Sequence, residues 1–161
     1  LQLIIQSHVL SHVTYCLPVW GGACKTQQAR VQKALNFAAR VITGKRKRDH
    51  ISPAMRALEW PTFQEMVLER DLINVHRALH DSRTPAALRS LFVLRNQVSV
   101  RNTRAHDRCL QLPRCRLEAT RRSFVCRAVS GWNALPPSAL ECPTRSAFKA
   151  QLRRRRKNGS Q

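Results

Sequence analysis

Closely spaced arginines and lysines are the residues whose types and spacing could do chemistry in this sequence. Guanidinium groups bind phosphate oxygens two at a time, and ammonium groups attract them as point charges. The run Lys45–Arg48 could alternatively be a solvated loop, and Arg153–Lys157 could be a frayed tail. From this spacing we predict nucleic-acid phosphate contacts by Lys45, Arg46, Lys47, Arg48, Arg101, Arg104, Arg108, Arg114, Arg116, Arg121, Arg122, Arg153, Arg154, Arg155 and Arg156.

The whole-chain charge supports this prediction. Lys and Arg total 29 against 9 acidic residues, which gives a formal net charge of +20 and an isoelectric point near 11.6. Arg outnumbers Lys by 23 to 6, a bias that favours paired contacts with phosphate over simple solubility. Among residues 101–122, Asp107 and Glu118 are too few to neutralise seven arginines. The composition therefore predicts a polyanionic partner.

The sequence contains no group of residues with the spacing of a known catalytic motif. Metal-assisted phosphoryl transfer needs carboxylates clustered around two divalent cations. His50 with Ser52, or Cys126 with His106, could pair a nucleophile with a base, but no glycine-flanked nucleophile or orienting carboxylate accompanies either pair. We therefore expect no enzymatic activity from this chain alone. The aspartates are widely separated, at Asp49, Asp71, Asp81 and Asp107.

Two groups of histidines and cysteines are possible metal ligands, although neither has a zinc-site spacing. His8, His12 and Cys16 share one side of a predicted helix, without an evident fourth ligand. Ordinary packing on a helix face explains them better, and we predict neither a metal nor a cofactor. The six cysteines show no disulfide framework, so we expect free thiols. The second group fits neither a zinc finger nor a zinc knuckle and comprises His106, Cys109, Cys115 and Cys126.

Helical periodicity dominates the first part of the chain. Apolar residues recur at helical spacing, Gly44 is a natural helix stop, and Thr62 and Glu65 have the spacing of a capping box. Ser52 is the expected N-cap of a short helix that has Pro53 in its first turn. The predicted helices cover residues 1–15, 26–43, 52–59, 62–80 and 86–94.

The second part of the chain is more basic and less regular. The net charge is +6 up to residue 85, from 12 basic and 6 acidic residues, and +14 beyond it, from 17 and 3. Residues 95–118 have weak periodicity, although Val98 and Val100 alternate as in a short strand. Helices are predicted over 121–134, ended by Pro136–Pro137, and after a Thr144 cap.

Three tryptophans, Trp20, Trp60 and Trp132, adjoin apolar helical segments. We expect them to anchor the core and not to stack on bases. The sequence thus predicts a mainly α fold, with a bundle-like helical region at 1–94 and an irregular, Arg-rich helical extension at 95–161. One continuous domain is an equally acceptable interpretation.

Several short motifs follow one another along nearly the whole chain. They are YCLPVWG at 15–21, VQKALNFAARVITG at 31–44, LEWP at 58–61, NTR at 102–104, LP at 112–113, SF at 123–124, WNALP at 132–136 and FK at 148–149. In order and spacing they resemble the segment that follows the palm in reverse transcriptases of jockey-like, LINE-type (non-LTR) retrotransposons. Each motif is weak by itself, but the ordered set is specific.

The resemblance implies a thumb-like region and a C-terminal extension of an RNA-directed DNA polymerase, gripping template RNA or duplex behind the active site. No aromatic-x-Asp-Asp motif is present, so the palm and its catalysis are missing. The chain starts at Leu1, inside an apolar pattern, and we interpret it as a fragment. The implied partners are RNA, RNA–DNA or DNA duplex, and the upstream palm.

Two other classes of protein remain possible from the sequence. One is a free-standing basic RNA-binding protein of ribosomal or nucleolar type, and the other is an enzyme with a converging catalytic pocket. No apolar run of 18 residues and no signal peptide are evident, so we expect no membrane partner and an intracellular location, in nucleus and cytoplasm.

Overall fold

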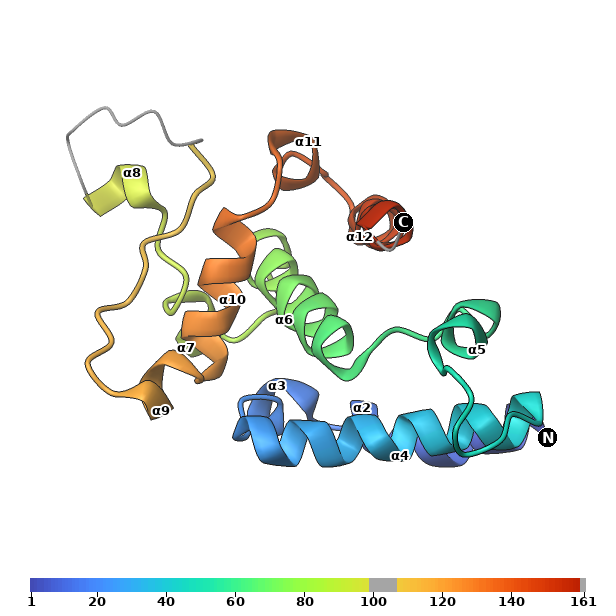
Figure 1. Ribbon diagram of the computed structural model, residues 1–161. Coiled ribbons are helices and arrows are strands. Elements are labelled where there is room, and N and C mark those ends of the chain that lie inside the picture. The colour runs from blue at the N-terminus through green and yellow to red at the C-terminus, as the bar shows by residue number, and fades with distance from the viewer. Residues whose placement is uncertain (99–106, 160–161) are drawn as a thin grey trace. The chain divides into compact units, whose positions relative to one another are not determined.

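The computed structural model describes residues 1–98 and 107–159. These residues are mainly helical, as the sequence predicts, and no β-strand lies within the described ranges. Leu94 and Leu110 form an isolated antiparallel bridge. The chain separates into two compact units, Leu1–Val67 and Leu68–Gln161, which are described separately below (Figure 1).

The first unit begins with an almost continuous helical stretch, in agreement with the helix predicted over residues 1–15. Its middle part is a π-helical turn, and it ends where Tyr15 becomes extended and Cys16 adopts a left-handed conformation (φ 46°). A further turn, α3, follows, which the sequence does not predict because Pro18 indicates only the end of a helix. The segments are α1 (Gln2–Ile5), η1 (Gln6–Leu10), α2 (Ser11–Thr14) and α3 (Leu17–Trp20).

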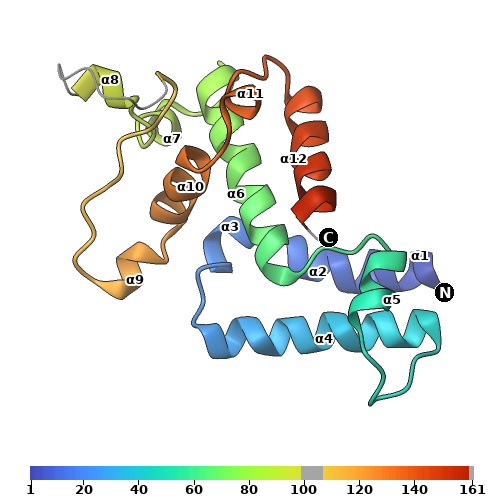
Figure 2. The ribbon, with the colours of Figure 1, turned by 45° about the horizontal axis from the view of Figure 1, so that its top comes forward.

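The longest helix, α4 (Lys25–Thr43), confirms the helix predicted over residues 26–43. Gly44 ends it in a left-handed conformation (φ 66°), and its N–H donates to the Arg40 carbonyl. Glycine adopts this conformation without a steric cost. In Figure 2 α4 lies alongside the α1–α2 stretch, and contacts of α4 with α1 and η1 confirm this pairing.

Two apolar clusters hold the first unit together. In one, Leu35 of α4 packs with Leu17, and the rings of Trp20 and Phe63 stack with centroids 5.2 Å apart. In the other, Met55 of α5 (Ser52–Ala57) and Trp60 cover alanines of α4. The predicted Ser52 cap is wrong, because Ile51 is the N-cap and Ser52 already lies within the helix.

Helix α6 (Phe63–His80) contributes its first turn, through Val67, to the first unit and the remainder to the second. Its predicted capping box is confirmed. The Thr62 N–H donates to the Glu65 carboxylate (2.7 Å), and the Glu65 N–H donates to the Thr62 hydroxyl (3.3 Å). The Phe63 N–H also donates to the Gln32 side chain of α4 (2.7 Å). These bonds satisfy N–H groups that a helix start otherwise leaves unpaired.

In the second unit, α6 lies between α10 and α12 (Figure 2). The core contains Trp132 and Phe148, both fully buried, and the ring of buried His76 stacks on Phe148 with centroids 4.6 Å apart. Burial lowers the pKa of His76, and its ring contacts the Cys142 carbonyl at 2.9 Å. The other helices of this unit are α7 (Ala86–Arg89), α8 (Arg95–Val98), α9 (Glu118–Arg121), α10 (Phe124–Asn133), α11 (Pro137–Leu140) and α12 (Arg145–Gly159).

Several predictions for the second unit are corrected. The helix predicted over 86–94 covers only Ala86–Arg89, and Val98 lies in α8 and not in a strand. The helix predicted over 121–134 is present as α10 (Phe124–Asn133), and Arg121 instead ends the separate helix α9. Pro136–Pro137 ends α10 but also starts α11, because proline fits the first turn of a helix. The boundary between the compact units lies at Val67–Leu68. The division expected at residues 94–95, from charge and regularity, stays a prediction.

A buried ion pair crosses the second unit from α6 to α10. Asp71 is 1% exposed, and the Arg127 guanidinium donates to its carboxylate from Nε at 3.0 Å and from Nη2 at 3.4 Å. Burial raises the pKa of Asp71 to about 6, although the hydrogen bond and charge of Arg127 oppose the shift. No local pattern in the sequence indicates this pair, because its members are 56 positions apart.

Gly21→Ala is expected to destabilise the first unit by roughly 1–3 kcal/mol through overpacking. A Cβ at this position would lie 2.6 Å from the Leu17 carbonyl oxygen, which is backbone and cannot move aside. Gly131→Ala is the matched control, because its Cβ would meet mainly the end of the flexible Leu68 side chain, and alanine favours the helix. Urea denaturation of both variants measures the effect, and equal losses would contradict this account.

The pKa of Asp71 predicts a pH-dependent stability difference between the wild type and Asp71→Asn. Between pH about 4 and about 6 the unfolded carboxyl ionises while the folded one stays protonated, so rising pH favours unfolding. The free energy of unfolding of the wild type, relative to that of the variant, should fall by up to a few kcal/mol over this window and then level off. Urea titrations across the window measure this. Taking the difference cancels the contribution of His76, and a difference that rises with pH would contradict the prediction.

Candidate nucleic-acid interface

The basic loop Lys45–Arg48 follows directly from the end of α4. The Asp49 carboxylate accepts a hydrogen bond from the Arg46 N–H (2.8 Å), and the Asp49 N–H donates to the Arg46 carbonyl (3.1 Å). One acid thus shapes the loop through its backbone and leaves the cationic side chains outward. All four are exposed, and none has a side-chain hydrogen bond or ion pair with the described residues.

A second set of cations, Arg114, Arg116 and Arg121, lies on and after an extended segment that precedes α9. The base of this segment is fixed, because the Asn133 side chain makes two hydrogen bonds of 2.8 Å with the backbone of Leu110. The three guanidinium groups are exposed and make no ion pair with the described residues. Holding one end of the segment in place reduces the conformational entropy that its cations lose on binding.

A third set belongs to α12. The Thr144 hydroxyl accepts a hydrogen bond from the Ala147 N–H (3.3 Å) at the helix start, as the predicted cap requires. Phe148 and Leu152 are buried, so the helix is fixed by its apolar side. Arg153 and Arg154 are exposed and have no partner among the described residues.

Four of the predicted arginines already have intramolecular contacts. Arg156 pairs with Glu69 (3.3 Å), and Arg155 donates to the Ala134 carbonyl (3.3 and 3.4 Å). Arg108 donates to the Leu140 carbonyl (3.2 Å). Arg122 is half-buried, and its Nε lies 4.0 Å from the Glu118 carboxylate. These four would have to exchange existing contacts for phosphate, so the three sets above are the better candidates.

Arg101 and Arg104 lie outside the described residues, so their part of the prediction has no structural counterpart. Sequence reasoning did not distinguish partnered from unpartnered arginines, because the partners are distant in the chain. Glu69 and Arg156, for example, are 87 positions apart. Only a hydrophobic pattern that placed Arg156 toward α6 could have indicated their contact.

The tryptophans, the cysteines and the possible metal ligands are the remaining residues with distinctive chemistry. Trp60 and Trp132 are buried and Trp20 is partly buried, in agreement with core anchoring. All six cysteines are free thiols, as expected, and the Sγ atoms of Cys115 and Cys126 are 2.6 Å apart. Within the described ranges, no group of three or more acidic, His or Cys side chains could hold a metal ion.

Neither a membrane span nor a known relative indicates the function of the chain. Among the described residues, no helix combines the length and apolar character needed to cross a bilayer. No protein-family model, curated protein or solved structure matches the chain. The ordered motifs and the surface cations are therefore the basis of the functional proposal.

Removing unpaired arginines should weaken nucleic-acid binding more than removing paired ones. Arg114→Ala/Arg116→Ala is expected to lower affinity for an RNA–DNA duplex and to reduce the slope of log K against log salt by about 0.9 for each phosphate that the variant no longer neutralises. The matched control is Arg77→Ala/Arg83→Ala, which removes the same charge from residues that share Asp81. Fluorescence anisotropy over a salt series measures both. Equal effects would mean that net charge alone, without local contacts, governs binding.

Proposed function

We propose that this chain is the non-catalytic, nucleic-acid-binding C-terminal part of a LINE-type retrotransposon reverse transcriptase. It grips template RNA or RNA–DNA duplex through backbone phosphates. The observation that carries the binding proposal is the presence of three sets of exposed cations without intramolecular partners, in a chain of net charge +20. Phosphate contacts of this kind position a nucleic acid without reading its sequence.

The family and the thumb-like role rest on the motif resemblance. The helical fold agrees with such a role, and two of the motifs lie at defined structural positions. VQKALNFAARVITG forms the end of α4 and its glycine stop, and WNALP spans the end of α10 and the turn into α11. In these motifs the large apolar residues are buried: Leu35 supports the packing within the first unit, and Trp132 supports the packing within the second.

The contacts of three aspartates support the proposal that this chain is a non-catalytic part of the enzyme. Asp71 is buried against Arg127, Asp49 binds backbone in the loop after α4, and Asp81 pairs with Arg77 and Arg83. Each of these carboxylates has a structural partner, and none forms, with other described residues, a group that could hold metal. The two divalent metals of polymerisation would accordingly be held by the palm, upstream of Leu1 in the parent enzyme.

Exposed apolar side chains favour this proposal over a free-standing RNA-binding protein of ribosomal or nucleolar type. Leu1, Leu3 and Ile4 are 69%, 80% and 61% exposed. Apolar side chains grouped at a helix start are typical of a surface that packs against another part of a protein. We propose the upstream palm as that part, and an intracellular site of action in cytoplasm and nucleus, where retrotransposon RNA is copied.

The binding proposal predicts a steep salt dependence. Affinity of the chain for an RNA–DNA duplex should fall sharply between low and moderate salt, with a log–log slope that reflects about five or more phosphate contacts. Duplexes of different sequence should bind alike. Anisotropy titrations measure both properties, and salt-independent binding or no binding would exclude phosphate gripping.

The family proposal has a separate test, in the nucleotide sequence that encodes the chain. The reading frame immediately upstream of Leu1 should encode a polymerase palm with paired aspartates. Sequencing the transcript that contains this frame answers the question. An initiator methionine close to Leu1, with no palm before it, would favour the free-standing RNA-binding protein.

A further inference from the structure

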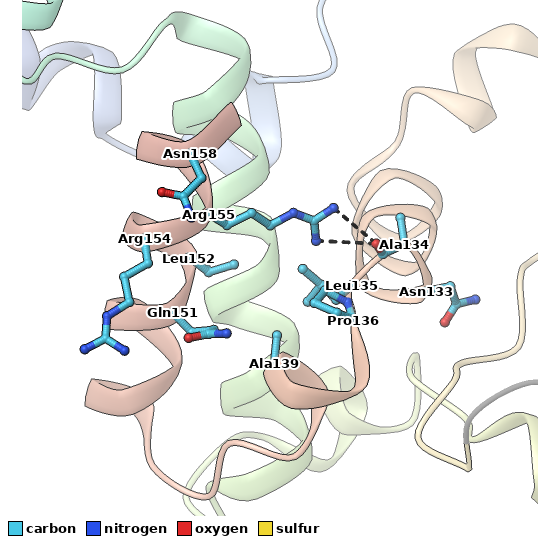
Figure 3. Close-up of a pocket in the computed structure, with 10 residues that line it drawn as sticks. All are labelled: Asn133, Ala134, Leu135, Pro136, Ala139, Gln151, Leu152, Arg154, Arg155 and Asn158. Atoms are coloured by element: carbon cyan, nitrogen blue, oxygen red, sulfur yellow. Dashed lines mark hydrogen bonds between the residues drawn. The ribbon is translucent and has the colours of Figure 1, made fainter. Parts of the chain in front are cut away.

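A groove of about 620 Å³ lies in the second unit, where α12 passes the end of α10 and the start of α11. Figure 3 shows Leu152 of α12 directed toward Leu135 and Pro136. The volume falls in the range of small-molecule sites, roughly 300–1,000 Å³. No sequence pattern indicates this groove, since it depends on the packing of segments about twenty positions apart.

The groove combines an apolar floor with polar groups that have no partner. Leu135, Ala139 and Leu152 are buried and form the floor. Gln151 and Asn158, two turns apart on α12, line it as well, and their amides make no hydrogen bond with the described residues. An amide supplies both donors and an acceptor. The groove can therefore receive a flat, apolar group that has a hydrogen-bonding edge.

The charge of the lining is purely positive. None of the ten lining residues is acidic, whereas Arg154 and Arg155 are both present and exposed. Arg155 reaches across from α12 to the Ala134 carbonyl, while Arg154 extends outward from the same helix (Figure 3). The Arg155 bonds, 3.3 and 3.4 Å long, are weak beside a guanidinium–phosphate contact of roughly 2.7–2.9 Å. A phosphate at the mouth of the groove could thus recruit Arg155.

We propose that this groove binds one unpaired nucleotide of a single strand, with the base over the apolar floor and its edge at Gln151 and Asn158. The phosphate contacts Arg155, which already reaches across the groove, and Arg154 adds positive charge nearby. This inference rests on the proposed nucleic-acid binding and adds a preference for an unpaired base, which phosphate contacts alone do not give. A paired base is excluded, because its edge is already bonded and its faces are stacked in the duplex.

The test compares two labelled single strands of about ten nucleotides, one with all its bases and one abasic throughout. Their backbones carry the same charge, so phosphate contacts are equal. The wild-type chain should bind the strand with bases about ten-fold more tightly. Gln151→Ala/Asn158→Ala should lose most of that advantage and bind the abasic strand as the wild type does. Anisotropy titrations at one salt concentration measure all four affinities.

The matched control is Asn96→Ala/Gln97→Ala, which removes two exposed amides from α8. It should bind both strands as the wild type does, and circular dichroism confirms that both variants fold. Equal wild-type affinity for the two strands, with steep salt dependence, would overturn the groove inference but leave the proposed function intact. No binding to either strand or to an RNA–DNA duplex would overturn the proposed function itself. A polyglutamate peptide whose affinity falls in Gln151→Ala/Asn158→Ala, while strand binding does not, would assign the groove to acidic peptides.

Discussion

The fold depends on how nine carboxylates are distributed among 29 cationic side chains. They cannot neutralise the chain, and the structure uses most of them to fix local geometry. Asp71 anchors α10 to α6 through Arg127, Glu69 holds α12 through Arg156, and Glu65 caps α6. Because the acids are committed to folding, most exposed arginines have no carboxylate left to pair with. The same shortage that makes internal neutralisation impossible thus produces a surface suited to a polyanion.

Burial changes how much a charged side chain contributes to the stability of the fold. Asp71 is almost completely removed from water, and its pKa rises to about 6 in spite of the adjacent guanidinium. Desolvation thus outweighs attraction in this pair, which makes it a costly way to join two helices. Removal of either partner would cost more still, because it would leave a buried polar group without its partner. Exposed Arg83, paired with Asp81, incurs no such desolvation cost and gains little from the pair.

Local signals in the sequence predicted the long helices and their ends, because these depend on periodicity and on single residues. The glycine stop at Gly44, the Thr62–Glu65 capping box and the Thr144 cap all occur as expected. Short helices such as α3, α8 and α11 were missed, since one turn is too short for a periodic pattern. The candidate cations were found by type, but which of them are available was not. Availability depends on distant partners, such as Glu69 for Arg156, and so does the groove beside α12.

Arginine footprinting tests the central claim most directly. An arginine-selective dicarbonyl reagent is applied to the chain with and without an RNA–DNA duplex, and the modified positions are identified by mass spectrometry. Duplex should protect the arginines of the three sets and leave Arg77 and Arg83 equally reactive in both samples. The arginines of the three sets are Arg46, Arg48, Arg114, Arg116, Arg121, Arg153 and Arg154. Uniform protection of all exposed arginines, or protection of Arg77 and Arg83 instead, would contradict the account.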